Sequence, residues 1–191
     1  MKITKKWLRK KDACIDGYDW FCNQKETDSI KLIKKLMEED HFDYANWLIV
    51  NVMKYKQYVS YGVFAAELAL PIYEAQHPDN SVLREAIEAA KKCIEEPSKR
   101  NKQKAYDAYA AAYAAAENAY SCFAARAAFA AARVASAAYD ASYYTTAASD
   151  AASAVSAAAY RGASSAAEVT SSRKKIQQKI IKYGIKLLEE E

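Results

Sequence analysis

Glycine and proline are scarce in this chain, which has 4 Gly and 3 Pro among 191 residues. β-Sandwiches and barrels need many tight turns, in which these two residues are common. Their scarcity therefore argues against an all-β fold. A long apolar run is missing as well, because the most apolar stretch, Gly62 to Ile72, is short and contains Glu67. A membrane-spanning helix needs about 20 apolar residues, so we expect none here.

The sequence also lacks the motifs of common catalytic and metal sites. Its four cysteines form no CxxC pair and its two histidines stand alone, so we expect no metal site. It has no glycine-rich phosphate loop and no nucleophile elbow. We therefore expect a protein that is not an enzyme and uses no cofactor. The first eleven residues are charged and hold no continuous apolar signal segment, which favours a cytoplasmic location.

Alanine is abundant: it fills 31 of the 63 positions from Ala105 to Ala167. Alanine is the best helix former and a poor strand former. The sequence therefore predicts an all-α fold, a compact multi-helix bundle of roughly eight helices. We expect a single domain over residues 1–191. Within it, residues 1–98 form helices rich in large side chains, and residues 99–191 form closely packed helices rich in alanine and tyrosine.

Capping residues predict where several helices begin, because their side chains accept hydrogen bonds from the first free amides. Thr4 is expected to cap a helix at the start of the chain, one of Thr27, Asp28 and Ser29 the helix that begins near residue 30, and Asp43 and Ser81 two later helices. The last helix is expected over about residues 164–188, where large apolar residues recur on one stripe.

Larger apolar residues recur at steps of three and four in the alanine-rich segment. They are Tyr106, Tyr109, Tyr113, Tyr120 and Phe123. This spacing predicts a heptad-like seam, in which alanine lets helices approach closely and tyrosine supplies most of the buried area. Because residues 101–161 contain no Gly or Pro, one unbroken helix would be roughly 90 Å long. We therefore expect the helix to be broken at positions that are not marked by Gly or Pro.

Arg126 and Arg133 stand out in this segment, because they lie seven residues apart and so project from the same side of one helix. Guanidinium groups on an alanine surface can receive a carboxylate or a phosphate in bidentate fashion. One interpretation is a partner- or anion-binding groove formed by both arginines with Tyr113 and Tyr120.

The alternative interpretation is structural. Carboxylates on neighbouring helices, among them Glu67 and Asp140, would neutralise the two arginines and set the packing register. The segment from Ala105 to Ala167 has three arginines against four carboxylates. Nucleic-acid stacking platforms need a basic track, so we expect no nucleic-acid partner.

The positive charge of the chain, +4 overall, is concentrated at the N-terminus. Six basic residues precede the first acidic one, Asp12: Lys2, Lys5, Lys6, Arg9, Lys10 and Lys11. This basic segment (residues 2–11) is either a solubilising, frayed terminus or a docking surface for an acidic partner.

Five stretches carry a family resemblance: Ala13–Phe21, Ala45–Leu48, Tyr61 with Ala65–Glu67, the turn His77–Asp79, and Arg84–Ala90. With the alanine-rich half that follows, they resemble the alanine-rich immunity proteins of bacterial toxin–immunity neighbourhoods and tailed phages. The resemblance implies an all-helical binding protein that neutralises a partner. Arg84, in the last of these stretches, joins the candidate partner-binding residues.

Three functions are consistent with these patterns. The leading hypothesis is a non-enzymatic inhibitor of the immunity or phage anti-defence type, which binds a protein toxin or a host-defence protein. The second is a binder that sequesters a phosphorylated nucleotide signal, a small anionic ligand, through Arg126, Arg133 and nearby tyrosines. The third is a structural protein that self-assembles into homo-oligomers through the seam of alanine and tyrosine.

Overall fold

The computed structural model describes residues 1–75, 77–118 and 166–190. This part of the chain forms eight α-helices and no strand, apart from an isolated bridge between Lys2 and Asp28. The predicted all-α fold is therefore confirmed. The helices are α1 (Lys5–Lys10), α2 (Ile15–Cys22), α3 (Ser29–Glu38), α4 (Phe42–Val52), α5 (Tyr55–Glu74), α6 (Val82–Glu95), α7 (Lys99–Asn118) and α10 (Ala166–Glu189).

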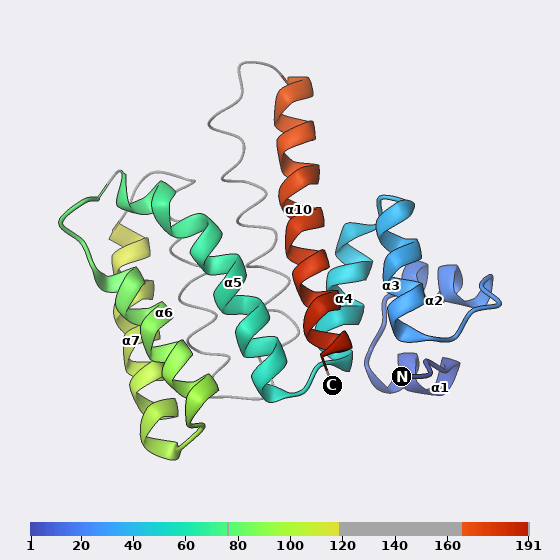
Figure 1. Ribbon diagram of the computed structural model, residues 1–191, viewed down its shortest axis with the longest axis horizontal. Helices are drawn as coiled ribbons and strands as arrows, with labels where there is room; N and C mark the ends of the chain where they lie inside the picture. Colours follow the sequence, from blue (N-terminus) through green and yellow to red (C-terminus); the bar gives the residue numbers. More distant parts are fainter. Residues whose placement is uncertain (76, 119–165, 191) are drawn as a thin grey trace.

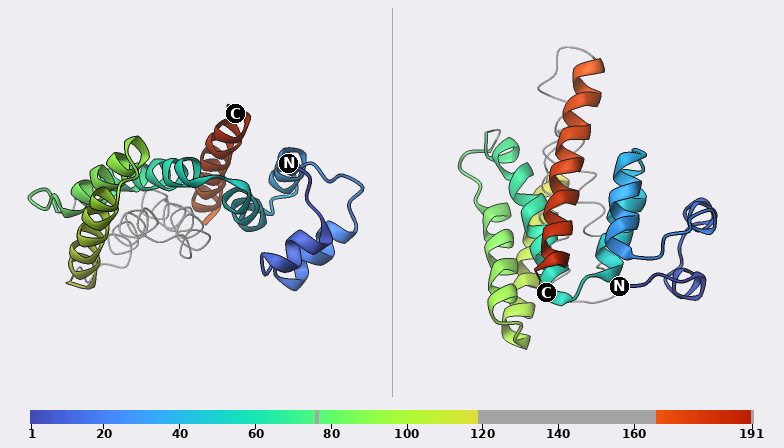
Figure 2. Two further views of the ribbon diagram at one scale, coloured as in Figure 1. Left: turned by 90° about the horizontal axis from the view of Figure 1, so that it is seen from below. Right: turned by 45° about the vertical axis from the view of Figure 1, so that its right-hand side comes forward.

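The described helices follow one another across the molecule (Figure 1). α7 packs on α6, α6 on α5, and α5 on α10. α10 also contacts α4 and α3, so the last helix of the chain lies between α5 and the α3–α4 pair. The short helices α1 and α2 form a small unit at the end opposite to α6 and α7 (Figure 2).

The core where α10 meets α4 and α5 depends on a glycine. A Cβ atom at Gly184 would lie 2.7 Å from Cε2 of Tyr61 and 3.0 Å from Cγ2 of Ile49, well inside the optimal carbon–carbon separation of about 3.5–4.0 Å. Tyr61 is completely buried, and its hydroxyl donates a hydrogen bond to Oδ1 of Asn46. Burial raises the pKa of the Tyr61 hydroxyl. Glycine at position 184 therefore allows α10 to pack closely against the buried Tyr61 ring.

The predicted Thr4 cap is confirmed, and among the candidates Thr27, Asp28 and Ser29 the cap is Asp28. The Thr4 hydroxyl accepts a hydrogen bond from the Trp7 amide at 3.1 Å and caps α1. The Asp28 carboxylate accepts from the amides of Ile30 and Lys31, both at 3.1 Å, and caps α3.

The other two capping predictions differ from the structure. The cap of α4 is His41 rather than Asp43, which lies in the first turn of the helix, where a negative charge is favourable to the helix dipole. Ser81 does precede α6, but its side chain makes no capping bond. Asn80 Oδ1 accepts from the Val82 amide instead, at 3.1 Å. The first amide of α6 is therefore bound by the side chain one residue before the predicted cap.

The first part of the predicted tyrosine seam lies in α7. Among the described side chains of α7, Ala105 and Ala112 are fully buried, whereas Tyr106 is 43% exposed. Ala86 and Ala90 of the neighbouring α6 are also fully buried. The buried stripe at this end of the segment is therefore made of alanine, one position before the predicted tyrosine frame.

The last helix, α10, runs from Ala166 to Glu189, close to the predicted span. No helix among the described residues is both long enough and apolar enough to cross a membrane. Helix α7 is continuous from Lys99 to Asn118, and the rest of residues 101–161, in which breaks were predicted, lies outside the described residues. The single domain stays a prediction.

Candidate functional site

Most of the predicted arginine groove lies outside the described residues. This applies to Arg126, Arg133, Tyr120 and Asp140. Tyr113 belongs to α7, but its side chain is not among those described. The groove therefore stays a prediction.

The other two predicted site residues join α5 to α6. Lys91 Nζ lies 2.8 Å from a carboxylate oxygen of Glu67 and 2.7 Å from one of Glu88, and these two hydrogen bonds raise the pKa of Lys91. Arg84 binds Glu74 in bidentate fashion, through Nε at 2.9 Å and Nη2 at 2.7 Å. Exposed pairs of this kind contribute about 0–1 kcal/mol each. Glu67 and Arg84 thus have partners inside the chain.

The basic segment is exposed, and its charges are not neutralised internally. All six of its basic side chains are exposed. Within the described residues none of them forms an ion pair with a carboxylate. Arg9 instead donates a hydrogen bond to the Tyr18 hydroxyl at 2.9 Å, with its guanidinium carbon 5.2 Å from the centre of that ring. The segment therefore presents uncompensated positive charge to solvent.

The backbone around the basic segment is held in place, which differs from a frayed terminus. The Ile3 amide donates to the carbonyl of Thr27 at 2.7 Å, and the Ser29 amide donates to the carbonyl of Met1 at 2.8 Å. Ile3 and Leu8 are buried, with 1% and 4% exposure. The apolar side of α1 is thus anchored to the fold, while its basic side faces solvent.

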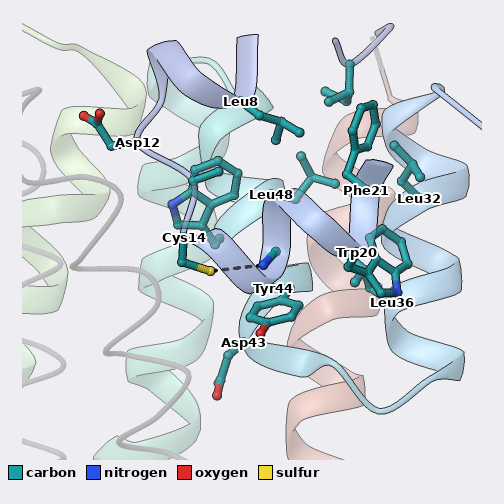
Figure 3. Close-up of a pocket in the computed structure, with 14 residues that line it drawn as sticks. Leu8, Asp12, Cys14, Trp20, Phe21, Leu32, Leu36, Asp43, Tyr44 and Leu48 are labelled. Carbon is teal, nitrogen blue, oxygen red and sulfur yellow. Dashed lines mark hydrogen bonds between the residues drawn. The ribbon is translucent and has the colours of Figure 1, made fainter. Parts of the chain in front are cut away.

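A pocket that the sequence did not reveal lies beside the basic segment, where α1 and α2 meet α3 and α4 (Figure 3). Its volume is about 370 Å³ and fourteen residues line it. Four of these are aromatic and two are acidic: Trp20, Phe21, Tyr44, Trp47, Asp12 and Asp43. We call this cavity the N-terminal pocket.

The chain between α1 and α2 builds one wall of the N-terminal pocket. Asp12 has a φ of 54°, a left-handed conformation that Asn and Asp adopt more readily than other non-glycine residues. It turns the chain so that Cys14 can cap α2, with its Sγ accepting from the Gly17 amide at 3.4 Å. A Cβ atom at Gly17 would lie 3.2 Å from that sulfur, so glycine leaves room for the cap.

Aromatic contacts organise the opposite wall. The Trp47 ring meets Trp7 edge-on at a centroid distance of 6.0 Å, and Tyr44 stacks on His41 at 5.4 Å. Trp20 Nε1 donates a hydrogen bond to a carboxylate oxygen of Glu39 at 2.6 Å, which holds the indole ring in position. Such contacts fix ring positions before any ligand arrives.

The charged groups that line the N-terminal pocket are both carboxylates, Asp12 and Asp43. Both are exposed, and neither has an ion-pair partner among the described residues. Desolvation raises the pKa of Tyr44, and the neighbouring carboxylates of Asp16 and Asp43 raise it further. The pocket therefore combines apolar walls with two carboxylates at its rim.

The stretches that carry the family resemblance contain much of this lining. Trp20 and Phe21 belong to the first of them, and Trp47 and Leu48 to the second. Their concentration of aromatic residues was the available signal, but the sequence did not show that the two stretches face each other.

The described residues contain no cluster of three or more metal-ligating side chains. Comparison with protein-family models, with curated proteins and with solved structures found no match to this chain. The resemblance to immunity proteins therefore stays a prediction.

Proposed function

We propose that the protein is a cytoplasmic, non-enzymatic binding protein that neutralises an acidic protein partner, a toxin or a host-defence protein, by holding it on the basic segment. One observation carries the proposal: six exposed cations lack ion-pair partners within the described residues, in a segment whose first residues are hydrogen-bonded to residues 27–29. The family resemblance points in the same direction.

The arrangement of these cations is unfavourable for the isolated protein. Lys5 and Arg9, and likewise Lys6 and Lys10, lie four residues apart on α1, so each pair repels. Like-charge pairs at this spacing cost roughly 0.2–0.5 kcal/mol each. A partner with a negative surface would relieve this repulsion. Clustered charge would also speed the encounter, by about 10- to 1,000-fold at low salt.

Charge reversal on α1 tests the proposal. The test variant is Lys5→Glu/Lys6→Glu/Lys10→Glu. The control, Lys92→Glu/Lys104→Glu/Lys182→Glu, has the same net charge but changes exposed lysines on α6, α7 and α10. We expect wild type and control, used as bait in nuclease-treated lysate of the native host, to recover the same acidic protein, and the test variant to lose it.

The neutralising role has its own readout. Expression of the recovered protein alone should arrest growth of a bacterial host, and co-expression of wild type, but not of the test variant, should restore it. Recovery of no protein, or equal recovery by the test variant, would contradict the proposal.

The other two functions depend on residues outside those described, and they stay predictions. Stabilisation of the protein against heat by a cyclic or linear nucleotide would support sequestration through Arg126 and Arg133. A dimer or larger species in light scattering would support self-assembly.

A further inference from the structure

We infer that the N-terminal pocket binds a small organic cation with an apolar body, such as an arylalkylammonium ion. This inference is independent of the proposed function, because the pocket and the basic segment use different side chains. Leu8 of α1 lines the pocket, whereas none of the basic residues 2–11 does.

The size and walls of the pocket fit a small molecule. Its volume of about 370 Å³ lies within the range of about 300–1,000 Å³ that is usual for small-molecule sites. The lining includes Trp20, Phe21, Tyr44 and Trp47. Aromatic faces attract a cation through the ring quadrupole, and tryptophan does so best. The walls therefore accept both an apolar body and a positive head.

The charges of the pocket select the sign of the ligand. Asp12 and Asp43 both line it, neither has an ion-pair partner among the described residues, and no lysine or arginine lines it. Figure 3 shows Asp12 and Asp43 at opposite ends of the side of the pocket away from Phe21 and Leu32, with both carboxylates turned outward, so they mark the rim of the pocket. The two carboxylates would repel an anion, and a neutral ligand would gain no attraction from them. A cation whose apolar end lies toward Phe21 would bury that end against the aromatic walls and place its positive head nearer to the two carboxylates.

The tryptophans of the chain provide a local reporter. The sequence has three: Trp20 and Trp47 line the pocket, and the Trp7 ring lies 6.0 Å from that of Trp47. Intrinsic tryptophan fluorescence, excited where a phenyl ring does not absorb, therefore reports on ligand entry without a label.

The experiment titrates the full chain with three compounds of one shape: 4-phenylbutylammonium, 4-phenylbutanol and 4-phenylbutanoate. We expect saturable binding of the ammonium compound about tenfold or more tighter than that of the alcohol, with the carboxylate weakest. Lysine amide, a mimic of a peptide side chain, should bind more weakly than the arylalkylammonium ion because it lacks a ring.

Variants assign the effect to the two carboxylates. Asp12→Asn/Asp43→Asn should bind the ammonium compound and the alcohol within about twofold of each other, while its affinity for the alcohol stays at the wild-type value. Asparagine keeps the shape of the side chain and tolerates the positive φ of Asp12. The control Asp16→Asn/Asp19→Asn removes the same charge from α2 residues that do not line the pocket and should retain the preference. If the double variant unfolds at a lower temperature, Asp43→Asn alone serves.

Absence of saturable binding by the ammonium compound would overturn the inference. Equal affinity for all three compounds, or an unchanged preference in Asp12→Asn/Asp43→Asn, would overturn it as well. Lysine amide binding as tightly as 4-phenylbutylammonium would assign the pocket to a peptide side chain instead.

Discussion

The close approach at Gly184 gives a stability prediction that can be worked out from the structure. In Gly184→Ala, the new methyl group would start 2.7 Å from the Tyr61 ring and 3.0 Å from Ile49. The ring cannot swing aside freely, because Tyr61 is fully buried and its hydroxyl is bound to Asn46. Helix α10 must therefore move away from α4 and α5, or the core must rearrange.

The expected size follows from two opposing effects. Overpacking of a well-filled core costs about 1–3 kcal/mol, and replacing glycine by alanine within a helix returns about 1 kcal/mol. We expect Gly184→Ala to lower the free energy of unfolding by up to about 2 kcal/mol, which in a chain of this size lowers the melting temperature by up to roughly 8 °C. Far-UV circular dichroism during urea and thermal unfolding measures both quantities.

The effect of Gly184→Ala on stability should reverse when Tyr61 is replaced by a smaller residue. In a Tyr61→Leu protein the ring is gone, so adding Gly184→Ala should be neutral or stabilising by up to about 1 kcal/mol. The coupling energy between positions 61 and 184 is then about 1–3 kcal/mol. If Gly184→Ala stabilises the wild-type protein, or if the two changes are additive, the proposed seating of α10 on Tyr61 is wrong.

Three further predictions concern single groups. Asp28→Ala should lower the free energy of unfolding by about 1 kcal/mol in urea titration, because two amides of α3 lose their acceptor. Asp28→Asn should keep most of the stability of the wild type, because asparagine is also a good cap. Tyr61 should make the protein sensitive to alkali: its folded-state pKa is raised, so the folded state holds this proton more tightly than the unfolded one. The free energy of unfolding is then unaffected by this group below pH of about 10 and falls by up to about 1.4 kcal/mol per pH unit above it. Tyr61→Phe should remove that slope between pH of about 10 and 11, and an identical slope in the variant would refute the assignment. Arg84→Ala should change stability by less than about 1 kcal/mol, since its pair with Glu74 is exposed; a larger loss in thermal unfolding would show that the pair organises the α5–α6 contact.

The helical fold and several helix starts could be predicted from local features of the sequence. Scarce glycine and abundant alanine indicate an all-α fold without reference to any tertiary contact, and the Thr4 and Asp28 caps depend on hydrogen bonds within a few residues. The capping prediction for Asp43 is wrong because the helix begins earlier, after His41. Asp43 therefore lies in the first turn, where its charge still favours the helix.

Contacts between helices were harder to predict. Tyr106 belongs to a regular apolar frame, yet Ala105 is the buried neighbour, because the closest packing uses the smallest side chain. The N-terminal pocket could not be predicted, since α2 supplies Trp20 and α4 supplies Trp47, and only tertiary packing brings them together. The basic segment could be recognised in the sequence because its six basic residues lie within ten positions, but their lack of internal ion-pair partners could be seen only in the structure.

The most direct test of the central claim is the dissociation constant of the recovered partner, measured by calorimetry as salt rises from about 50 to about 500 mM. We predict that wild type and Lys92→Glu/Lys104→Glu/Lys182→Glu bind tightly at low salt and weaken steeply and equally as salt rises. Lys5→Glu/Lys6→Glu/Lys10→Glu should bind at least about tenfold more weakly at low salt and show little salt dependence. Equal affinities of the three proteins at every salt concentration would contradict the assignment of the basic segment as the partner-binding surface.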